Sequence, residues 1–332
     1  MTTLKPMHSK SKFTLRQPNY LDITRCRILY RQAYKNMKLI EPLSQKQTYA
    51  INAIETDGCV IFDSYIPEEK LKTMQLELNQ ALINLQFNTP CLAQNKIDPN
   101  IHEDLINNHM LATPQQLEEQ GVTFDKSQAI NYKQVLTDFH PSTLTVPMLE
   151  MSTTYQQIWT DPFILGIIAA YLGIVPKLTE AYVRRNFPAN YRSMNHYWHR
   201  DINHNFHLLK MFVFLSDCTI ETGPHEFIKG SHTNLKILNG QRYYQDAQIN
   251  KIYPPSHENR VLSTVKAGTV IIENTQGLHR ATIPKTAYRD LGFGVFMPIP
   301  PLYRHKNYHF PKDAYQALSA FQKAFIPKSF TN

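Results

Sequence analysis

The sequence lacks the features of several protein classes. It contains no run of about 18 uncharged apolar residues, so we expect no membrane span, and no apolar segment near its start is typical of a secretory signal. Its four cysteines, Cys26, Cys59, Cys91 and Cys218, are far apart and form neither a disulfide framework nor a C-x-x-C pair. We therefore expect reduced thiols and a cytoplasmic protein.

Excess charge is also missing from most of the chain, although the formal net charge is +8. Residues 1–46 carry ten basic and two acidic side chains, whereas the remainder carries 25 of each sign. Attraction to an acidic surface would therefore belong to this basic N-terminal arm. No aromatic-and-basic pattern typical of RNA binding accompanies the arm, so we expect no nucleic-acid partner.

The length of 332 residues predicts one enlarged domain over 47–332 after the arm. Pro67, followed by two glutamates, indicates the start of a helix. A second helix is predicted to begin after Asp161 and to end at Gly173. The segment 88–150 is polar and contains five prolines, which suits a lid or substrate-binding insertion, with a plain surface loop as the alternative.

After residue 176 the chain consists of short runs rich in β-branched and aromatic residues. The runs are 180–187, 195–201, 208–215, 269–273 and 291–297. Turn-forming clusters separate them. Several short strands after two helices predict a mainly β fold with flanking helices, and we favour a jelly roll.

Candidate metal ligands occur in one of these runs, Asn-His-Tyr-Trp-His-Arg-Asp at 195–201. On a strand, His199 and Asp201 would project to the same face, because side chains alternate between faces. His279, just beyond an apolar strand, is the best candidate for a third ligand. Two histidines and one carboxylate leave three positions of an octahedral metal open, which suits an iron(II) site that binds a cosubstrate and O2.

The sequence also suggests roles for four other residues near this candidate site. Arg289, ten residues after His279, could hold a distal carboxylate through two parallel hydrogen bonds. Lys210 interrupts an apolar strand and could reach a carboxylate, although we favour a stem along the core with its ammonium in water. Trp198 and Arg200 should point away from the ligands and pack structurally.

Several motifs carry a resemblance to a known family. They are WHRD at 198–201, LKMFVFLSD at 209–217, GPH at 223–225, GSH at 230–232, and GT at 268–269 leading to His279 and Arg289. With these motifs the sequence resembles the phytanoyl-CoA dioxygenase family. The resemblance implies a double-stranded β-helix, iron(II) at His199, Asp201 and His279, and 2-oxoglutarate anchored by Arg289. It also implies a dioxygenase that hydroxylates a small-molecule substrate and releases succinate and CO2.

The sequence departs from the family at one position. Some members place a hydroxylated residue two positions after the distal histidine to help hold 2-oxoglutarate, whereas this chain has Ala281 there. Thr282 is the candidate substitute.

Three alternatives remain open at this stage. A cupin-like isomerase or ligand-binding protein would bind iron without consuming 2-oxoglutarate, and an interaction protein with a vestigial site would bind no iron. A histidine-rich neighbourhood, His204, His207, His225 and His232, raises the possibility of zinc. No H-E-x-x-H motif or cysteine cluster accompanies these histidines, so zinc ranks second to iron.

Overall fold

The computed structural model describes residues 28, 30–89, 110–119, 121, 123–139, 141–192, 194–201, 208–234, 243–297 and 307–331. Most of the basic arm therefore lies outside the described residues, and so does part of the proposed lid, 90–109. The division into an arm, one jelly-roll domain and a lid stays a prediction. None of the described helices is both long enough and apolar enough to cross a membrane.

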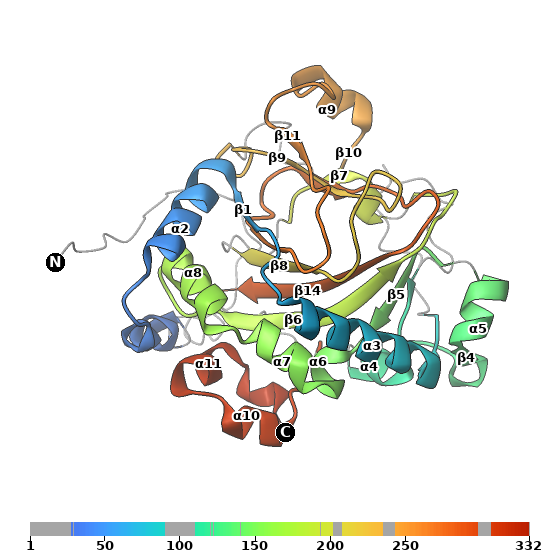
Figure 1. Ribbon diagram of the computed structural model, residues 1–332, viewed down its shortest axis with the longest axis horizontal. Helices are drawn as coiled ribbons and strands as arrows, with labels where there is room; N and C mark the ends of the chain where they lie inside the picture. Colours follow the sequence, from blue (N-terminus) through green and yellow to red (C-terminus); the bar gives the residue numbers. More distant parts are fainter. Residues whose placement is uncertain are drawn as a thin grey trace.

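Two sheets form the centre of the molecule (Figure 1), and their strands are antiparallel except for the parallel pair β3–β5. The large sheet has the order β1-β12-β8-β14-β6-β5-β3 and the small sheet the order β10-β7-β13-β9-β11. Strands of the large sheet are β1 (Cys59–Phe62), β12 (Val270–Glu273), β8 (Leu209–Phe214), β14 (Arg289–Met297), β6 (Lys177–Asn186), β5 (Thr143–Val146) and β3 (Met110–Leu111). Strands of the small sheet are β10 (Tyr243–Tyr244), β7 (Trp198–His199), β13 (His279–Ala281), β9 (His225–Ile228) and β11 (Arg260–Leu262). Two further strands, β2 (Gln86–Phe87) and β4 (Ile130–Asn131), pair with each other.

Helices flank the sheets, as predicted. The α-helices are α2 (Gln45–Asp57), α3 (Glu68–Asn84), α4 (Pro114–Glu119), α5 (Tyr132–Gln134), α6 (Met148–Met151), α7 (Thr153–Trp159), α8 (Pro162–Leu172), α9 (Asp246–Ile252), α10 (Lys312–Ala317) and α11 (Ala320–Phe325). The 3-10 helices are η1 (Asn36–Leu39), η4 (Lys126–Gln128), η6 (Met194–His196) and η8 (Lys328–Phe330), and η5 (Val135–Phe139) is a π-helix. Most α-helices lie on the side of the large sheet opposite the small sheet, and α9 lies beyond the small sheet (Figure 1). The predicted fold class, mainly β with flanking helices, is confirmed.

Local sequence signals explain where helix α8 begins and ends. The Asp161 carboxylate accepts hydrogen bonds from the backbone N–H groups of Phe163 and Ile164, which the first turn of a helix leaves without partners. Pro162 occupies the first helical position, where no N–H is needed. Gly173 ends the helix with a φ of 69°, a left-handed conformation that favours glycine. This helix and α3 both lie where the sequence predicted them.

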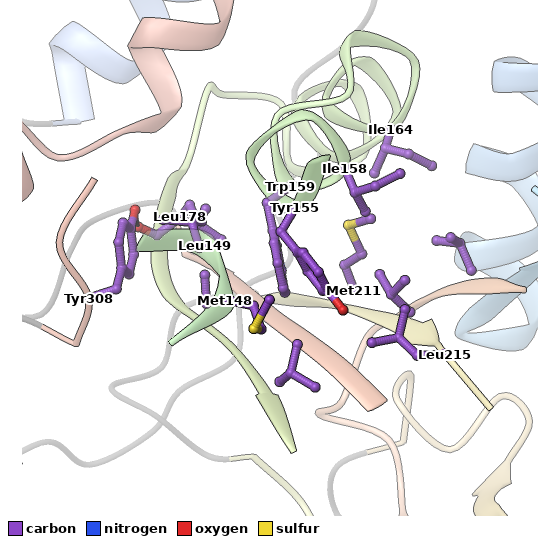
Figure 2. Close-up of a cluster of buried hydrophobic side chains, with 14 of the residues drawn as sticks. Met148, Leu149, Tyr155, Ile158, Trp159, Ile164, Leu178, Met211, Leu215 and Tyr308 are labelled. Carbon is purple, nitrogen blue, oxygen red and sulfur yellow. Dashed lines mark hydrogen bonds between the residues drawn. The ribbon is translucent and has the colours of Figure 1, made fainter. Parts of the chain in front are cut away.

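The main core lies between the large sheet and the helices that cover it. Figure 2 shows Tyr155 and Trp159 of α7 beside strand residues such as Leu178 and Met211. The two aromatic rings are stacked with their centroids 5.6 Å apart. A Cβ atom at Gly294 of β14 would lie 2.9 Å from the Trp159 indole, so that position requires glycine for the indole to approach the strand.

Four of the five predicted strand runs contain a strand of similar extent: β6, β8, β12 and β14. The exception is 195–201, where the structure has η6 and the two-residue strand β7. The segment 88–150 is also more regular than expected. All four residues of β5 are buried, and the strand pairs with β6 within the large sheet, so this part belongs to the body of the fold.

The face of the large sheet that points toward the small sheet is called the inner face below. Lys210 and Phe212 of β8 lie on it, because the first contacts Asp201 and the second packs on His225 of β9. By the register of the strands, Leu291, Phe293 and Val295 of β14 share this face with them. On β8 and β14 these residues make the inner face apolar, apart from the charged Lys210.

On the helix-covered face, an ion pair holds β14 to β6. Both Arg185 and Asp290 are almost completely buried, and two Arg185 nitrogens donate to the two Asp290 carboxylate oxygens at 2.8 and 2.7 Å. Asp290 directly follows Arg289, so the pair also fixes the start of β14. Breaking one side of such a pair leaves a buried charge without its partner.

We expect Asp290→Ala to lower the free energy of unfolding by roughly 3 to 5 kcal/mol, because Arg185 would remain buried without its carboxylate. Urea unfolding of the purified variant measures this loss. Asp217→Ala is the matched control, since it removes a carboxylate whose partner Lys266 is exposed, and such a pair contributes about 1 kcal/mol or less. Equal losses in the two variants would contradict the role given to the buried pair.

Candidate metal centre

Three side chains with metal-binding atoms lie close together. One ligand atom from each of His199, Asp201 and His279 lies within 4.8 Å of the others. The two imidazole centroids are 4.1 Å apart, and Nε2 of His279 lies 3.6 Å from Oδ2 of Asp201. Both histidines are buried and Asp201 is partly buried. The structure thus brings together the three residues predicted from the sequence as ligands.

The local structure that positions Asp201 differs from the prediction. Strand β7 ends at His199, so alternation along a strand does not place Asp201 beside it. Instead, the Asp201 N–H donates to the Thr275 carbonyl at 2.9 Å. His199 lies directly opposite His279 in the pairing of β7 with β13. The prediction of a strand over 195–201 was therefore wrong, although the two residues do lie together.

Backbone carbonyls orient both imidazole rings. Nδ1 of His199 lies 2.8 Å from the Tyr197 carbonyl, and Nδ1 of His279 lies 3.0 Å from the Gly277 carbonyl. A carbonyl can only accept a hydrogen bond, so each Nδ1 carries the proton and each Nε2 keeps its lone pair for a metal. A Cβ at Gly277 would lie 2.6 Å from the Phe227 ring, which explains the glycine at this position.

The protonation states suit metal binding. Burial lowers the pKa of His199 to about 4 and lowers the pKa of His279 well below its ordinary value, so both rings are neutral near neutral pH. Burial alone would raise the pKa of Asp201, but the adjacent Lys210 ammonium holds it below its ordinary value. The cluster therefore offers two neutral imidazoles and one carboxylate.

Lys210 points at this cluster. Its ammonium forms an ion pair with Oδ2 of Asp201, and its side chain is 13% exposed. We favoured an ammonium in water, and this expectation was wrong because the inner face of β8 is covered by the small sheet. The nearest anion is the carboxylate of the proposed metal ligand. Whether Lys210 also contacts 2-oxoglutarate stays a prediction.

Arg289, the predicted anchor for 2-oxoglutarate, is 2% exposed at the start of β14. Its Nε and Nη1 atoms are buried and have no hydrogen-bond partner within the described part of the chain. Burial lowers the pKa of Arg289, and the charge of nearby Arg184 lowers it further. A guanidinium buried without partners is costly unless a ligand supplies acceptors. A carboxylate would satisfy this position.

Thr282, the candidate substitute for the hydroxylated family residue, is engaged elsewhere. Its hydroxyl donates to the Pro224 carbonyl at 2.7 Å, and its backbone N–H donates to the same oxygen at 3.0 Å. The Thr282 hydroxyl therefore already has an acceptor, in the segment that directly follows β13. Nothing in this geometry supports a contact from Thr282 to 2-oxoglutarate.

The other histidines do not extend the cluster. His204 and His207 lie outside the described residues. Nε2 of His225 lies 2.8 Å from Oε2 of Glu273, and Nε2 of His232 lies 3.2 Å from a backbone carbonyl of α2. Among the residues that the structure describes, the His-Asp-His cluster is the one group of this kind.

The residues predicted to pack away from the ligands do so. Trp198 belongs to a buried cluster with Leu278 and others, and Arg280 lies over its ring at 4.8 Å. Arg200 donates to the backbone carbonyls of Ser231 and Gln276. Both side chains therefore support the small sheet that carries the cluster.

Sequence reasoning missed a polar strip on the inner face of β6. Glu180, Tyr182 and Arg184 alternate along this strand and, by register, lie on the same face as Val295, Phe293 and Leu291. Arg184 donates to the Tyr182 hydroxyl at 2.6 Å, and this hydroxyl lies 3.5 Å from Glu180. The signal was available as polar residues at every second position of a run assigned to a strand.

Comparison with family models gives a match over residues 54–287 to the model described as phytanoyl-CoA dioxygenase. A search of curated proteins found no match. Solved structures give matches at low sequence identity.

One similar structure is the non-heme alpha ketoglutarate dependent epimerase SnoN from nogalamycin biosynthesis, with a TM-score of 0.51 at 15% identity over 76% of this chain and 83% of that chain. Another is HygX from Streptomyces hygroscopicus with nickel, 2-oxoglutarate and hygromycin B bound, at TM-score 0.46 and 15% identity over 83% and 93%. A third is EctD from S. alaskensis with 2-oxoglutarate and 5-hydroxyectoine, at TM-score 0.45 and 17% identity over 77% of each chain. At such identities, the likeness to SnoN shows a shared fold.

Proposed function

Because the chain belongs to the phytanoyl-CoA dioxygenase family, we propose that it is an iron(II)- and 2-oxoglutarate-dependent dioxygenase that hydroxylates a small molecule. Nε2 of His199, Nε2 of His279 and the Asp201 carboxylate would hold the metal. Arg289 would hold the far carboxylate of 2-oxoglutarate. Iron(II) and 2-oxoglutarate, when bound, supply the oxidising power for C–H hydroxylation with O2, with release of succinate and CO2.

One observation carries the proposal: the interior of the fold holds a buried guanidinium with unpartnered nitrogens as well as a cluster of two neutral imidazoles and one carboxylate. A metal site alone would suit many reactions. The arginine adds the requirement for a second, carboxylate-bearing ligand, because a buried fork of N–H donors matches the geometry of a carboxylate.

The protein's own residues would bind, orient and exclude water. The Tyr197 and Gly277 carbonyls hold the two imidazoles in the tautomer that presents Nε2. Without a metal, the Lys210 ammonium balances the negative charge of the Asp201 carboxylate. The apolar side chains of the inner face, such as Phe212 and Phe293, would keep water from the reacting groups.

The proposal is tested by anaerobic reconstitution with iron(II) and 2-oxoglutarate, followed by exposure to O2 in the presence of candidate acyl thioesters, amino acids and sugar acids. Succinate release that depends on both iron and a candidate substrate is expected. Arg289→Ala protein is the control, because its iron ligands stay intact. Iron binding without any 2-oxoglutarate binding would refute the oxygenase assignment.

We expect hydroxylation rather than halogenation, because Asp201 occupies the position that a halide would need. With a carboxylate ligand in place, 2-oxoglutarate and O2 would take the positions that the protein leaves open, and none would remain for a halide. Once a substrate is identified, mass spectrometry of a reaction with excess chloride and labelled O2 should show a product heavier by one labelled oxygen atom. A chlorinated product would contradict the assignment of Asp201 as a ligand.

A further inference from the structure

The residues next to the two proposed histidine ligands lie on the outer face of the small sheet, the face turned away from the large sheet. Side chains alternate along a strand, so Trp198 points away from the metal cluster that its neighbour His199 joins. For the same reason, Arg280 points outward and His279 points inward. Glu226 of β9 lies directly opposite Arg280 in the strand pairing and therefore shares the outer face with it.

Glu226 is the centre of a buried ion cluster on this outer face. Its side chain is 5% exposed, and each of its two carboxylate oxygens accepts a hydrogen bond from a different guanidinium. Nε of Arg260 donates to Oε1, and Nε of Arg280 donates to Oε2 at 2.7 Å. The Glu226 carboxylate thus compensates two guanidinium groups that come from β11 and β13, the strands on either side of β9.

Both guanidinium groups also lie over the Trp198 ring. Cζ of Arg280 is 4.8 Å from the ring centroid, and Cζ of Arg260 is 5.1 Å from it. Trp198 is completely buried, and a guanidinium at this distance is attracted to the face of an indole. The ion cluster therefore connects three strands of the small sheet to the aromatic side chain of β7, the strand that carries His199.

Helix α9 lies beyond the outer face and contacts the same two arginines (Figure 1). Nη1 of Arg280 donates to Oδ1 of Asp246 at 2.7 Å, and Nη1 of Arg260 donates to Oδ1 of Asn250 at 2.8 Å. Both acceptors belong to α9. Each guanidinium is therefore held between the Glu226 carboxylate and this helix, which restricts where it can lie over Trp198.

The backbone alone does little to fix the spacing of the two imidazoles. Strands β7 and β13 share one residue pair, His279 opposite His199, whereas β13 and β9 share three. One further backbone hydrogen bond, from Asp201 to Thr275, joins the segments beside these strands. On the outer face, the contact of Arg280 with Trp198 also connects β13 to β7. A metal site requires ligand distances within about 0.2 Å of their ordinary values, so this contact bears on metal affinity.

We propose that Glu226 is a positioning residue for the metal centre, because it holds Arg280 against Trp198 and so fixes the spacing of the two imidazoles. The inference rests on the proposed function in one respect, since it takes His199 and His279 as metal ligands. Without the Glu226 carboxylate, the two largely buried guanidinium groups would repel each other. Outward movement of Arg280 would then shift its neighbour His279 on β13.

The test compares Glu226→Gln with Arg280→Met in the full chain, with nickel(II) as the probe. Both variants should weaken nickel binding by at least about tenfold, since groups that orient a ligand typically contribute 10 to 100-fold to metal affinity. Glu226→Gln makes the ion cluster more positive by one charge, whereas Arg280→Met makes it more negative by one. A direct effect of charge on the bound cation would therefore weaken binding in the first variant and strengthen it in the second. Effects of opposite sign would overturn the inference.

The visible absorption spectrum of the cobalt(II)-loaded protein provides a second measurement, because its bands depend on ligand geometry. At saturating cobalt(II), Glu226→Gln and Arg280→Met should both show shifted bands. Arg280→Lys keeps a cation and a donor at this position, so it should bind nickel more tightly than Arg280→Met and regain a spectrum close to that of the wild type. Equal defects in Arg280→Lys and Arg280→Met would contradict the role given to the pairing with Glu226.

Ile167→Ala is the matched control for lost stability. Ile167 is completely buried in α8, in the core that lies on the other side of the large sheet, so its truncation should lower the unfolding temperature and leave nickel affinity and the cobalt spectrum unchanged. If Glu226→Gln behaved in the same way, Glu226 would be a structural residue only and the inference would be wrong. Failure of the wild type to bind nickel would refute the metal site as well, whereas the other outcomes refute the positioning role alone.

Discussion

Arg289→Met should weaken 2-oxoglutarate binding severely and at the same time stabilise the ligand-free protein. Losing a buried, charge-assisted pair with a carboxylate costs roughly 2 to 5 kcal/mol, or about thirtyfold to several thousandfold in the dissociation constant. In the ligand-free protein the same guanidinium has two buried nitrogens without partners, each of which imposes roughly 1 to 3 kcal/mol. The two effects thus have opposite signs.

Calorimetric titration of the nickel protein with 2-oxoglutarate measures the first effect, and thermal unfolding without ligand measures the second. Arg289→Lys is the matched variant, because it keeps the charge but loses the paired N–H donors. Its affinity for 2-oxoglutarate should lie between those of the wild type and Arg289→Met. Unchanged affinity in Arg289→Met would move the anchor elsewhere, and Lys210, which already reaches Asp201, would be the next candidate.

His279→Ala and His199→Ala should each abolish succinate formation and weaken metal binding by more than about a hundredfold. Loss of a group that merely orients a ligand typically costs 10 to 100-fold in metal affinity, and these variants would remove a ligand itself. Nickel affinity and iron-dependent succinate release are the two measurements.

His225→Ala is the matched control for both histidine variants. Its ring lies 5.6 Å from the His279 ring between centroids, but it pairs with Glu273 and is not part of the cluster. We therefore expect metal affinity close to that of the wild type. Wild-type nickel affinity in His279→Ala or His199→Ala would show that the ligand assignment is wrong.

Much of the fold could be predicted because local signals are strong. The Asp161 cap and Gly173 determine α8 with little help from the rest of the chain. The run at 291–297 is continuously apolar because β14 lies between two covered faces, and all nine residues of this strand are buried. Such features depend on residues that are close together in the sequence, so one sequence is enough to predict them.

The site was predictable in its residues but not in its geometry. His199 and Asp201 were paired on the assumption of a continuous strand, whereas a hydrogen bond to Thr275, far away in the sequence, positions Asp201. Lys210 was expected to reach water, since the sequence does not show that the small sheet covers it. Glu180 was overlooked for the same reason: alternation shows that residues share a face, but not what lies opposite.

Strands β7 and β13 carry the two proposed histidine ligands, and the register that joins them consists of one residue pair, His279 opposite His199. A metal bound by both imidazoles would therefore link β7 to β13, the two neighbouring strands of the small sheet that share the fewest residue pairs. Because such an ion binds the folded state alone, it adds stability where the backbone supplies little. Bound iron would then increase the resistance of the protein to unfolding and proteolysis, in addition to its role in catalysis. Limited proteolysis with and without nickel should show cleavage that begins near β7 and β13 when the metal is withheld.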